Sequence, residues 1–120
     1  MDRASRRSAG MEVKRGDLVS VAIQGDYGKP RPALIIQSEL FSELASFTIL
    51  PLTGYLTTDR PLFRITVKPT AENGLTKPSQ IMIDKAHTVA REKIGKPFGR
   101  LGDETMLAVN RALAVFLGFA

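Results

Sequence analysis

Arg31 is the residue whose type and position are best suited to chemistry. It stands where a polar segment rich in glycine and proline, residues 24–30, leads into an apolar run at 33–37. An arginine is always charged, and its rigid fork of N–H donors matches the oxygens of a phosphate. At a strand end beside a loop, this side chain can face a ligand while the apolar residues anchor the backbone. The pattern therefore indicates a phosphate-binding position.

The composition excludes several other kinds of site. The chain has no cysteine and a single histidine, His87, so thiolate catalysis, disulfides and zinc sites made of cysteines or several histidines are excluded. The carboxylates are scattered, without the spacing of a metal-binding loop. We therefore expect any catalysis to use no metal and no other cofactor. The formal net charge of +5 favours a polyanionic partner, with nucleic acid first.

The length of 120 residues fits one domain. Residues 1–10 are polar and basic, which predicts a disordered leader or a tag, so that the single domain covers 11–120. No apolar stretch approaches the roughly 20 residues that span a bilayer. The basic start is not followed by the apolar core of a signal peptide. We therefore expect a cytoplasmic protein that makes no membrane contact.

Short apolar segments, some alternating with polar residues, predict a series of strands. The expected strands cover 19–23, 33–37, 47–53, 63–67, 79–89 and part of 95–101. Pro51 lies inside the third strand and predicts a bend or a sheet edge there. Residues 72–74 have the composition of a turn.

Two helices complete the expected elements. Ser38 is suited to cap a short helix over 39–44, with Leu40, Phe41 and Leu44 on one face. Asp103 is expected to cap a longer helix that runs to about residue 117 and stops at Gly118. Many short strands and one terminal helix do not fit a βαβ order. They predict a mainly β, α+β domain: a small, strongly bent antiparallel sheet or half-open barrel with a helix against it.

Four segments in this order resemble the MazF/PemK/Kid family of bacterial toxins, which are messenger-RNA endoribonucleases. The segments are 15–17, 31–36, 50–53, and 82–89 followed by 99–106. The resemblance implies a homodimer of SH3-like barrels that cleaves single-stranded RNA without a metal. It also implies products with 2′,3′-cyclic phosphate and 5′-hydroxyl ends, and inhibition by a cognate antitoxin protein. We expect that antitoxin to be acidic and partly disordered, because it would fold across a basic groove.

Two other functions remain open at this point. One is a barrel that has lost catalysis and only binds RNA or an antitoxin-like peptide. The other is a gyrase-poisoning toxin, a branch that resembles this one in fold. That branch uses a C-terminal tip with a tryptophan, whereas this chain has no tryptophan.

With the resemblance, Arg31, Thr53 and Asp84 become the candidate catalytic residues. Arg31 would hold the phosphate, and Thr53 would donate a hydroxyl hydrogen bond to a phosphate oxygen. Asp84 would act as a base or would orient Arg31. The alternatives are structural: a surface pair between Arg31 and Asp26, a turn closed by Thr53, and a carboxylate of Asp84 tied to an ion-pair partner. Some family members use an arginine as a general acid two residues before this aspartate, where the present chain has Met82.

Four further residues are candidates for RNA binding. Tyr27 could stack on an unpaired base, and Lys29 adds a charge beside Arg31. Lys85 and His87 are expected on the strand face opposite Asp84, unless the strand bulges or ends there. The larger apolar residues are expected in the core, namely Phe41, Phe47, Phe63, Met106 and Phe116.

Overall fold

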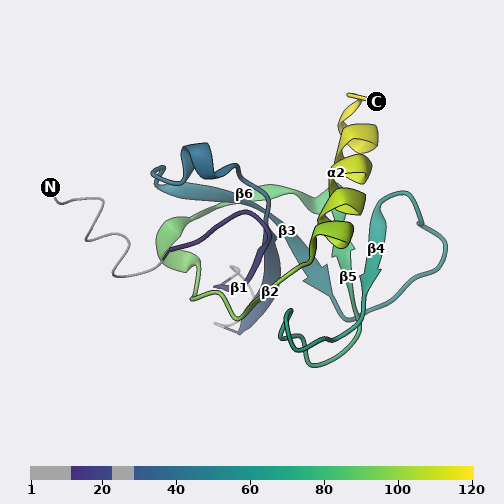
Figure 1. Cartoon of the computed structure of the whole chain (residues 1–120), viewed down its shortest axis with the longest axis horizontal. Helices are drawn as coiled ribbons and strands as arrows, with labels where there is room; N and C mark the ends of the chain where they lie inside the picture. The colour runs from purple at the N-terminus through teal and green to yellow at the C-terminus, as the bar shows by residue number, and fades with distance from the viewer. Residues whose placement is uncertain (1–11, 23–28) are drawn as a thin grey trace, which may run out of the picture.

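The structure is a computed structural model that describes residues 12–22 and 29–120. Within these residues a curled antiparallel sheet is joined to one C-terminal helix, α2 (Asp103–Leu117) (Figure 1). The expected leader at 1–10, and the loop that contains Tyr27 and Asp26, lie outside the described residues. The strands are β1 (Asp17–Ala22), β2 (Pro30–Ile35), β3 (Ser46–Thr53), β4 (Arg64–Val67), β5 (Ser79–Met82), β6 (His87–Ala90) and β7 (Gly99–Arg100).

The sheet has the strand order β4-β5-β3-β2-β1-β7, and β6 also pairs with β3. Every pairing among the described strands is antiparallel. β3 spans eight residues and belongs to both halves of the sheet. One half contains β1, β2 and β6, and the other contains β4 and β5 (Figure 1). The predicted bent antiparallel sheet with a helix against it is therefore confirmed.

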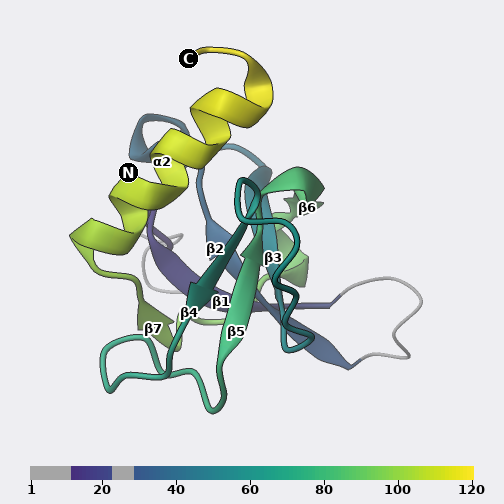
Figure 2. The ribbon, with the colours of Figure 1, turned by 90° about the vertical axis from the view of Figure 1, so that its right-hand side faces the viewer.

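The core lies on both faces of the sheet, because successive residues of a strand point to opposite sides. In β2, fully buried Leu34 packs in the cluster that includes Val109 of α2, whereas its neighbours Ala33 and Ile35 pack in a second cluster with Ile94. This double burial explains why residues 33–36 are continuously apolar. α2 crosses obliquely over the sheet (Figure 2) and packs against β4 and the turn after β5.

The expected strand at 79–89 is wrong as one element. β5 ends at Met82, a 3₁₀ turn η2 (Ile83–Lys85) follows, and β6 starts at His87. Both strands pair with β3, with Leu52 opposite Ile81 and Ile49 opposite His87. β3 thus advances three residues while the facing chain advances six, and η2 takes up the surplus. Pro51, which has no N–H to donate, lies between these two ladders. β3 pairs on both sides and is not an edge, so Pro51 marks this change of partner.

The helix at the C-terminus has the predicted bounds but a different cap. Gly102 is the N-cap residue and Asp103 is already helical, so its carboxylate acts on the helix dipole. Gly118 ends the helix in the left-handed region, as predicted, with φ of 87°.

The short helix after β2 is also smaller than expected. Ser38 does cap it, since its Oγ accepts a hydrogen bond from the N–H of Leu40 at 3.1 Å. However, only the 3₁₀ turn η1 (Glu39–Phe41) forms, and Leu40 is 86% exposed. A third 3₁₀ turn, η3 (Arg91–Lys93), follows β6. Of the residues expected in the core, Phe47 is buried and Phe63 and Met106 are partly buried, whereas Phe41 and Phe116 are largely exposed.

The loop before β5 is held by a buried asparagine. The Asn73 Oδ1 accepts hydrogen bonds from the N–H groups of Thr70 at 3.0 Å and Leu75 at 2.9 Å. Gly74 follows with φ of 68°, which confirms the predicted turn. A Cβ at Gly99 would lie 2.1 Å from the Asn73 carbonyl oxygen, so the loop and β7 are in close contact. The backbone that leads into β5 is therefore firmly placed.

Candidate functional site

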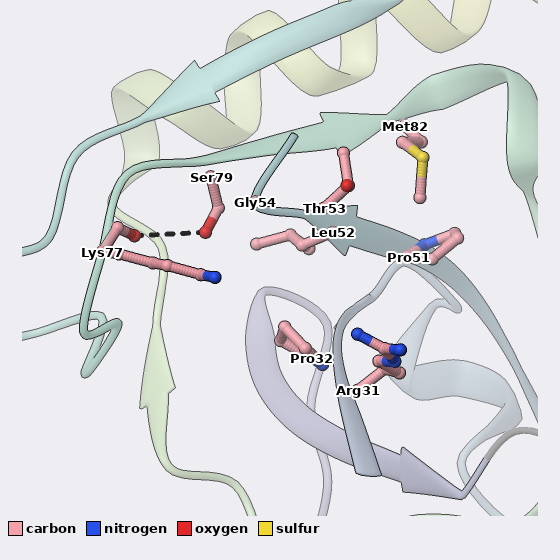
Figure 3. Close-up of a pocket in the computed structure, with 9 residues that line it drawn as sticks. All are labelled: Arg31, Pro32, Pro51, Leu52, Thr53, Gly54, Lys77, Ser79 and Met82. Carbon is pink, nitrogen blue, oxygen red and sulfur yellow. Dashed lines mark hydrogen bonds between the residues drawn. The ribbon is translucent and has the colours of Figure 1, made fainter. Parts of the chain in front are cut away.

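A cleft of about 410 Å³ opens where the ends of β2, β3 and β5 come together (Figure 3). Its lining combines two cations, two hydroxyls and several apolar side chains. The lining residues are Arg31, Pro32, Pro51, Leu52, Thr53, Gly54, Lys77, Ser79 and Met82. None of these described lining residues has a carboxylate, so the charges that face the cleft are positive. Such a surface suits an anion.

Sheet register brings Arg31 and Thr53 into this cleft together. Arg31 is the second residue of β2, and Thr53 is the last residue of β3. The ladder between β2 and β3 ends at the pair of Ala33 and Pro51, and Arg31 and Thr53 each lie two residues beyond it, at the same end of the two strands. Arg31 is exposed and Thr53 is half-buried. Two candidate catalytic residues from the sequence are therefore neighbours on one surface.

The hydroxyl of Thr53 is already fixed by one hydrogen bond. The N–H of Tyr55 donates to the Thr53 Oγ1 at 3.1 Å, which closes a small turn at the end of β3. Because a hydroxyl oxygen accepts and its proton donates, the Thr53 proton is left to donate to another group. A phosphate oxygen in the cleft would be such a group.

Asp84 does not line the cleft. It lies in η2, where the Arg64 Nε is 3.2 Å from Oδ1 and the Arg64 Nη2 is 3.4 Å from Oδ2. The Lys85 Nζ is 4.0 Å from the same Oδ2. Burial alone would raise the pKa of Asp84, but the Arg64 and backbone hydrogen bonds and the two positive charges together lower it. A carboxylate with a lowered pKa is a weak base at neutral pH, so this surrounding favours a structural pair.

The other candidate RNA-binding residues lie outside the lining of this cleft. Lys29 is exposed two residues before Arg31, at the entry to β2. Lys85 is exposed in η2, and exposed His87 starts β6 with its Nδ1 2.9 Å from the Lys85 carbonyl oxygen. The two-residue period cannot relate these residues to Asp84, because η2 interrupts the strand between them. A strand that ends at this point is the exception that the sequence argument allows.

The sequence argument missed Lys77 and Ser79, which form one wall of the cleft. A signal for Lys77 was present. Like Arg31, which stands between Pro30 and Pro32, Lys77 is a cation next to a proline at the start of a strand. Proline restricts its own φ and the residue before it, so both cations lie on stiff, extended backbone.

Two kinds of feature are absent from the described residues. No group of three or more His, Cys, Asp or Glu side chains is close enough to hold a metal ion within 12–22 and 29–120. No helix in the same part of the chain is both long and apolar enough to cross a membrane.

Comparison with known proteins gives consistent results along nearly the whole chain. A family model described as the PemK-like, MazF-like toxin of type II toxin–antitoxin systems matches residues 14–117. A curated protein of Mycolicibacterium smegmatis, named "Probable endoribonuclease MazF", is 47% identical over 109 residues, which cover 90% of this chain and 99% of that protein.

Solved structures show the same fold at lower sequence identity. An endoribonuclease from a mycobacterial species, in complex with its cognate antitoxin, has a TM-score of 0.75 at 23% identity. The match covers 91% of this chain and 98% of that one. The MazE-MazF structure from Deinococcus radiodurans has a TM-score of 0.72 at 19% identity, and covers 88% of this chain and 96% of that one.

Proposed function

Because this chain belongs to the PemK-like, MazF-like toxin family of type II toxin–antitoxin systems, we propose that its cleft binds and cleaves single-stranded messenger RNA. The chain is an endoribonuclease toxin, and the proposal concerns how it cuts. The observation that carries it is the pairing of Arg31 with Thr53 in a cleft whose described lining has cations and hydroxyls but no carboxylate.

In the proposed reaction the 2′-hydroxyl of one ribonucleotide loses its proton, and its oxygen attacks the adjacent phosphorus. The bond from phosphorus to the 5′-oxygen of the next nucleotide breaks, and that oxygen gains a proton. The ends are then a 2′,3′-cyclic phosphate and a 5′-hydroxyl, with no metal required. The attack places extra negative charge on the phosphate oxygens. The Arg31 guanidinium would neutralise this charge through paired hydrogen bonds, and the Thr53 hydroxyl would donate a further one. Donors already in place need little reorganisation, which favours the transition state over the substrate.

Asp84 retains a part in this proposal as a positioning residue. Its pair with Arg64 holds η2, the turn that directly follows the cleft residue Met82. This role is consistent with the lowered pKa of Asp84, because a general base works best when its pKa lies near the working pH. Lys29, Lys85 and His87, with Tyr27 from outside the described residues, are proposed to bind RNA away from the reacting phosphate.

The partners are proposed on two further observations. α2 carries exposed apolar side chains, most of them near its C-terminal end, and we propose that they join a second copy of this chain in a homodimer. They are Leu107, Val115, Phe116 and Leu117, with Phe119 beyond the helix. The positive cleft would receive an acidic, partly disordered segment of a cognate antitoxin, which then blocks RNA. Because messenger RNA is the substrate, the site of action would be the cytoplasm.

Cleavage of a long, mixed-sequence RNA in excess EDTA tests the function. The purified protein should cut at a limited set of sites, and Arg31→Ala should cut at least 100-fold more slowly, in line with the loss of one charged transition-state contact. Arg60→Ala, which removes an exposed arginine outside the cleft, should cut like the parent protein. If the folded Arg31→Ala protein retains full activity, the cleft is not the catalytic site. If the parent protein binds RNA but never cuts it, the chain is a binding barrel.

A further inference from the structure

Lys77 faces the cleft from the side opposite Arg31. Arg31 comes from β2, whereas Lys77 precedes β5, and the end of β3 with Leu52 and Thr53 lies between them (Figure 3). The cleft is therefore flanked by a cation on each side. One phosphate can be bound by one of these cations alone. A nucleic-acid strand carries a phosphate at every nucleotide, so each cation could contact a different phosphate.

The backbone of Lys77 is held at both ends of a very short segment. Leu75 and Ser79 are buried, and Leu75 also donates its N–H to the Asn73 side chain. The Ser79 hydroxyl donates to the Lys77 carbonyl oxygen at 3.1 Å. Pro78 restricts the remaining link. The starting point of the Lys77 side chain is therefore fixed, although the side chain itself is exposed.

The far end of the Lys77 side chain rests on the backbone of Gly54. A Cβ built on Gly54 would lie 2.7 Å from the Lys77 Cε and 2.9 Å from its Nζ. Both distances are too short for a real contact, so the ammonium occupies the place where any other residue would have its side chain. Gly54 directly follows Thr53, so the Lys77 ammonium lies against the residue that is next in sequence to the proposed catalytic threonine. A glycine at position 54 is what makes this placement possible.

From these contacts we propose that Lys77 is a second RNA-binding cation, which holds the phosphate adjacent to the one held by Arg31. The inference rests on the proposed cleavage of RNA in this cleft. An ammonium on a flexible stem acts as a point charge toward phosphate, which suits a neighbouring phosphate more than the geometry of the reacting one.

Binding of an RNA that cannot be cut tests the inference separately from the chemistry. The probe is a fluorescent single-stranded RNA, cut by the parent protein in its native form, with 2′-O-methyl groups at every position. One phosphate contact to a single strand contributes about 0.7 to the slope of log K against log salt. Lys77→Gln should therefore weaken binding about fivefold at 0.1 M salt, lower the slope by about 0.7, and bind like the parent near 1 M salt. Lys96→Gln, an exposed lysine outside the cleft, is the matched control.

Gly54→Ala provides a second test that leaves every charge in place. The new methyl would displace the Lys77 ammonium, and the backbone at position 54 has no positive φ that would strain an alanine. This variant should weaken binding at least twofold in the parent protein. In the Lys77→Gln background it should have no further effect, because the group that it displaces is gone.

The outcomes separate this inference from the function beneath it. If the parent protein fails to cut native RNA, the proposed function is wrong. If it cuts, but Lys77→Gln and Lys96→Gln weaken binding equally, Lys77 does not hold a phosphate. Equal effects of Gly54→Ala in both backgrounds would also overturn the inference, since the methyl would then act on something else. Urea unfolding of each variant confirms that the folded proteins are compared.

Discussion

Removal of the Asp84 carboxylate should destabilise this protein mainly because it leaves the charge of Arg64 buried without an ion-pair partner. The Arg64 side chain is only 7% exposed, and Asp84 is its carboxylate partner at 3.2 Å. Breaking a buried pair by removing one member costs about 3–5 kcal/mol, because the remaining charge stays buried. Asp84 itself is 20% exposed, so water can partly replace it. We therefore expect Asp84→Ala to lower the free energy of unfolding by about 2–3 kcal/mol.

A second substitution distinguishes two causes of this destabilisation: the buried charge of Arg64 that lacks a partner, and the loss of the hydrogen bonds between Arg64 and Asp84. Arg64→Met removes the guanidinium and keeps an unbranched side chain of similar length. The double variant Arg64→Met/Asp84→Ala should be more stable than Asp84→Ala alone, because no buried charge is left without a partner. Urea unfolding followed by circular dichroism at pH 7 measures all four proteins. A double variant that is less stable than either single variant would refute the reasoning.

The same pair predicts a pH dependence with a definite sign. The folded-state pKa of Asp84 is lowered, so its contribution is complete well above the unfolded value of about 3.9 and is lost as the pH falls through the folded value. The gap in unfolding free energy between the parent protein and Asp84→Ala should therefore shrink between pH 5 and pH 2. A gap that stays constant over this range would show that ionisation of the Asp84 carboxylate does not contribute to the stability of the folded protein.

Three other variants test separate parts of the structure. Gly99→Ala should destabilise the protein by more than about 3 kcal/mol in urea unfolding, because its Cβ would meet the Asn73 carbonyl oxygen at 2.1 Å; normal stability would disprove that close approach. Gly102→Ser should raise the unfolding free energy by about 0.5 kcal/mol, since the α2 cap position lacks a side-chain bond and a Cβ there meets nothing; a loss of stability would contradict this. Val115→Glu/Leu117→Glu should convert the proposed dimer to monomer in sedimentation, and an unchanged mass would place the dimer contact elsewhere or exclude it.

The strand framework could be predicted because its residues obey simple periods. Residues 33–36 are apolar without interruption, and the second half of β2, residues 33–35, is indeed buried on both faces. The α2 bounds follow from an acidic first turn and a glycine that adopts a left-handed stop. In both cases the signal is local, so that neighbouring residues carry all the information that is needed.

The end of β5 at Met82 could not be predicted from residues 79–89 alone, because it depends on how these residues pair with β3. β5 and β6 both pair with that strand, and the surplus in register is known only once both ladders exist. The partner of Asp84 could not be predicted for the same reason, since Arg64 comes from β4, 20 residues away in sequence.

The candidate site was found only in part for a similar reason. Arg31 and Thr53 could be named because each stands at a strand end within a segment that resembles the toxin family. Lys77 was missed because its position depends on Gly54, a glycine 23 positions earlier in the sequence. Nothing in the sequence shows that the Lys77 ammonium lies against this glycine. The charges in one segment do not show which distant part of the backbone their side chains will contact.

Analysis of the RNA ends is the most direct test of the central claim, that Arg31 and Thr53 promote attack by the neighbouring 2′-hydroxyl. A short RNA that contains a mapped cut site is incubated with the protein in excess EDTA, and the fragments are weighed by mass spectrometry. We predict a 2′,3′-cyclic phosphate on the upstream fragment and a 5′-hydroxyl on the downstream one, with no cut when the nucleotide before the site is 2′-deoxy. A 5′-phosphate end, or cleavage of the 2′-deoxy RNA at the parent rate, would contradict the account.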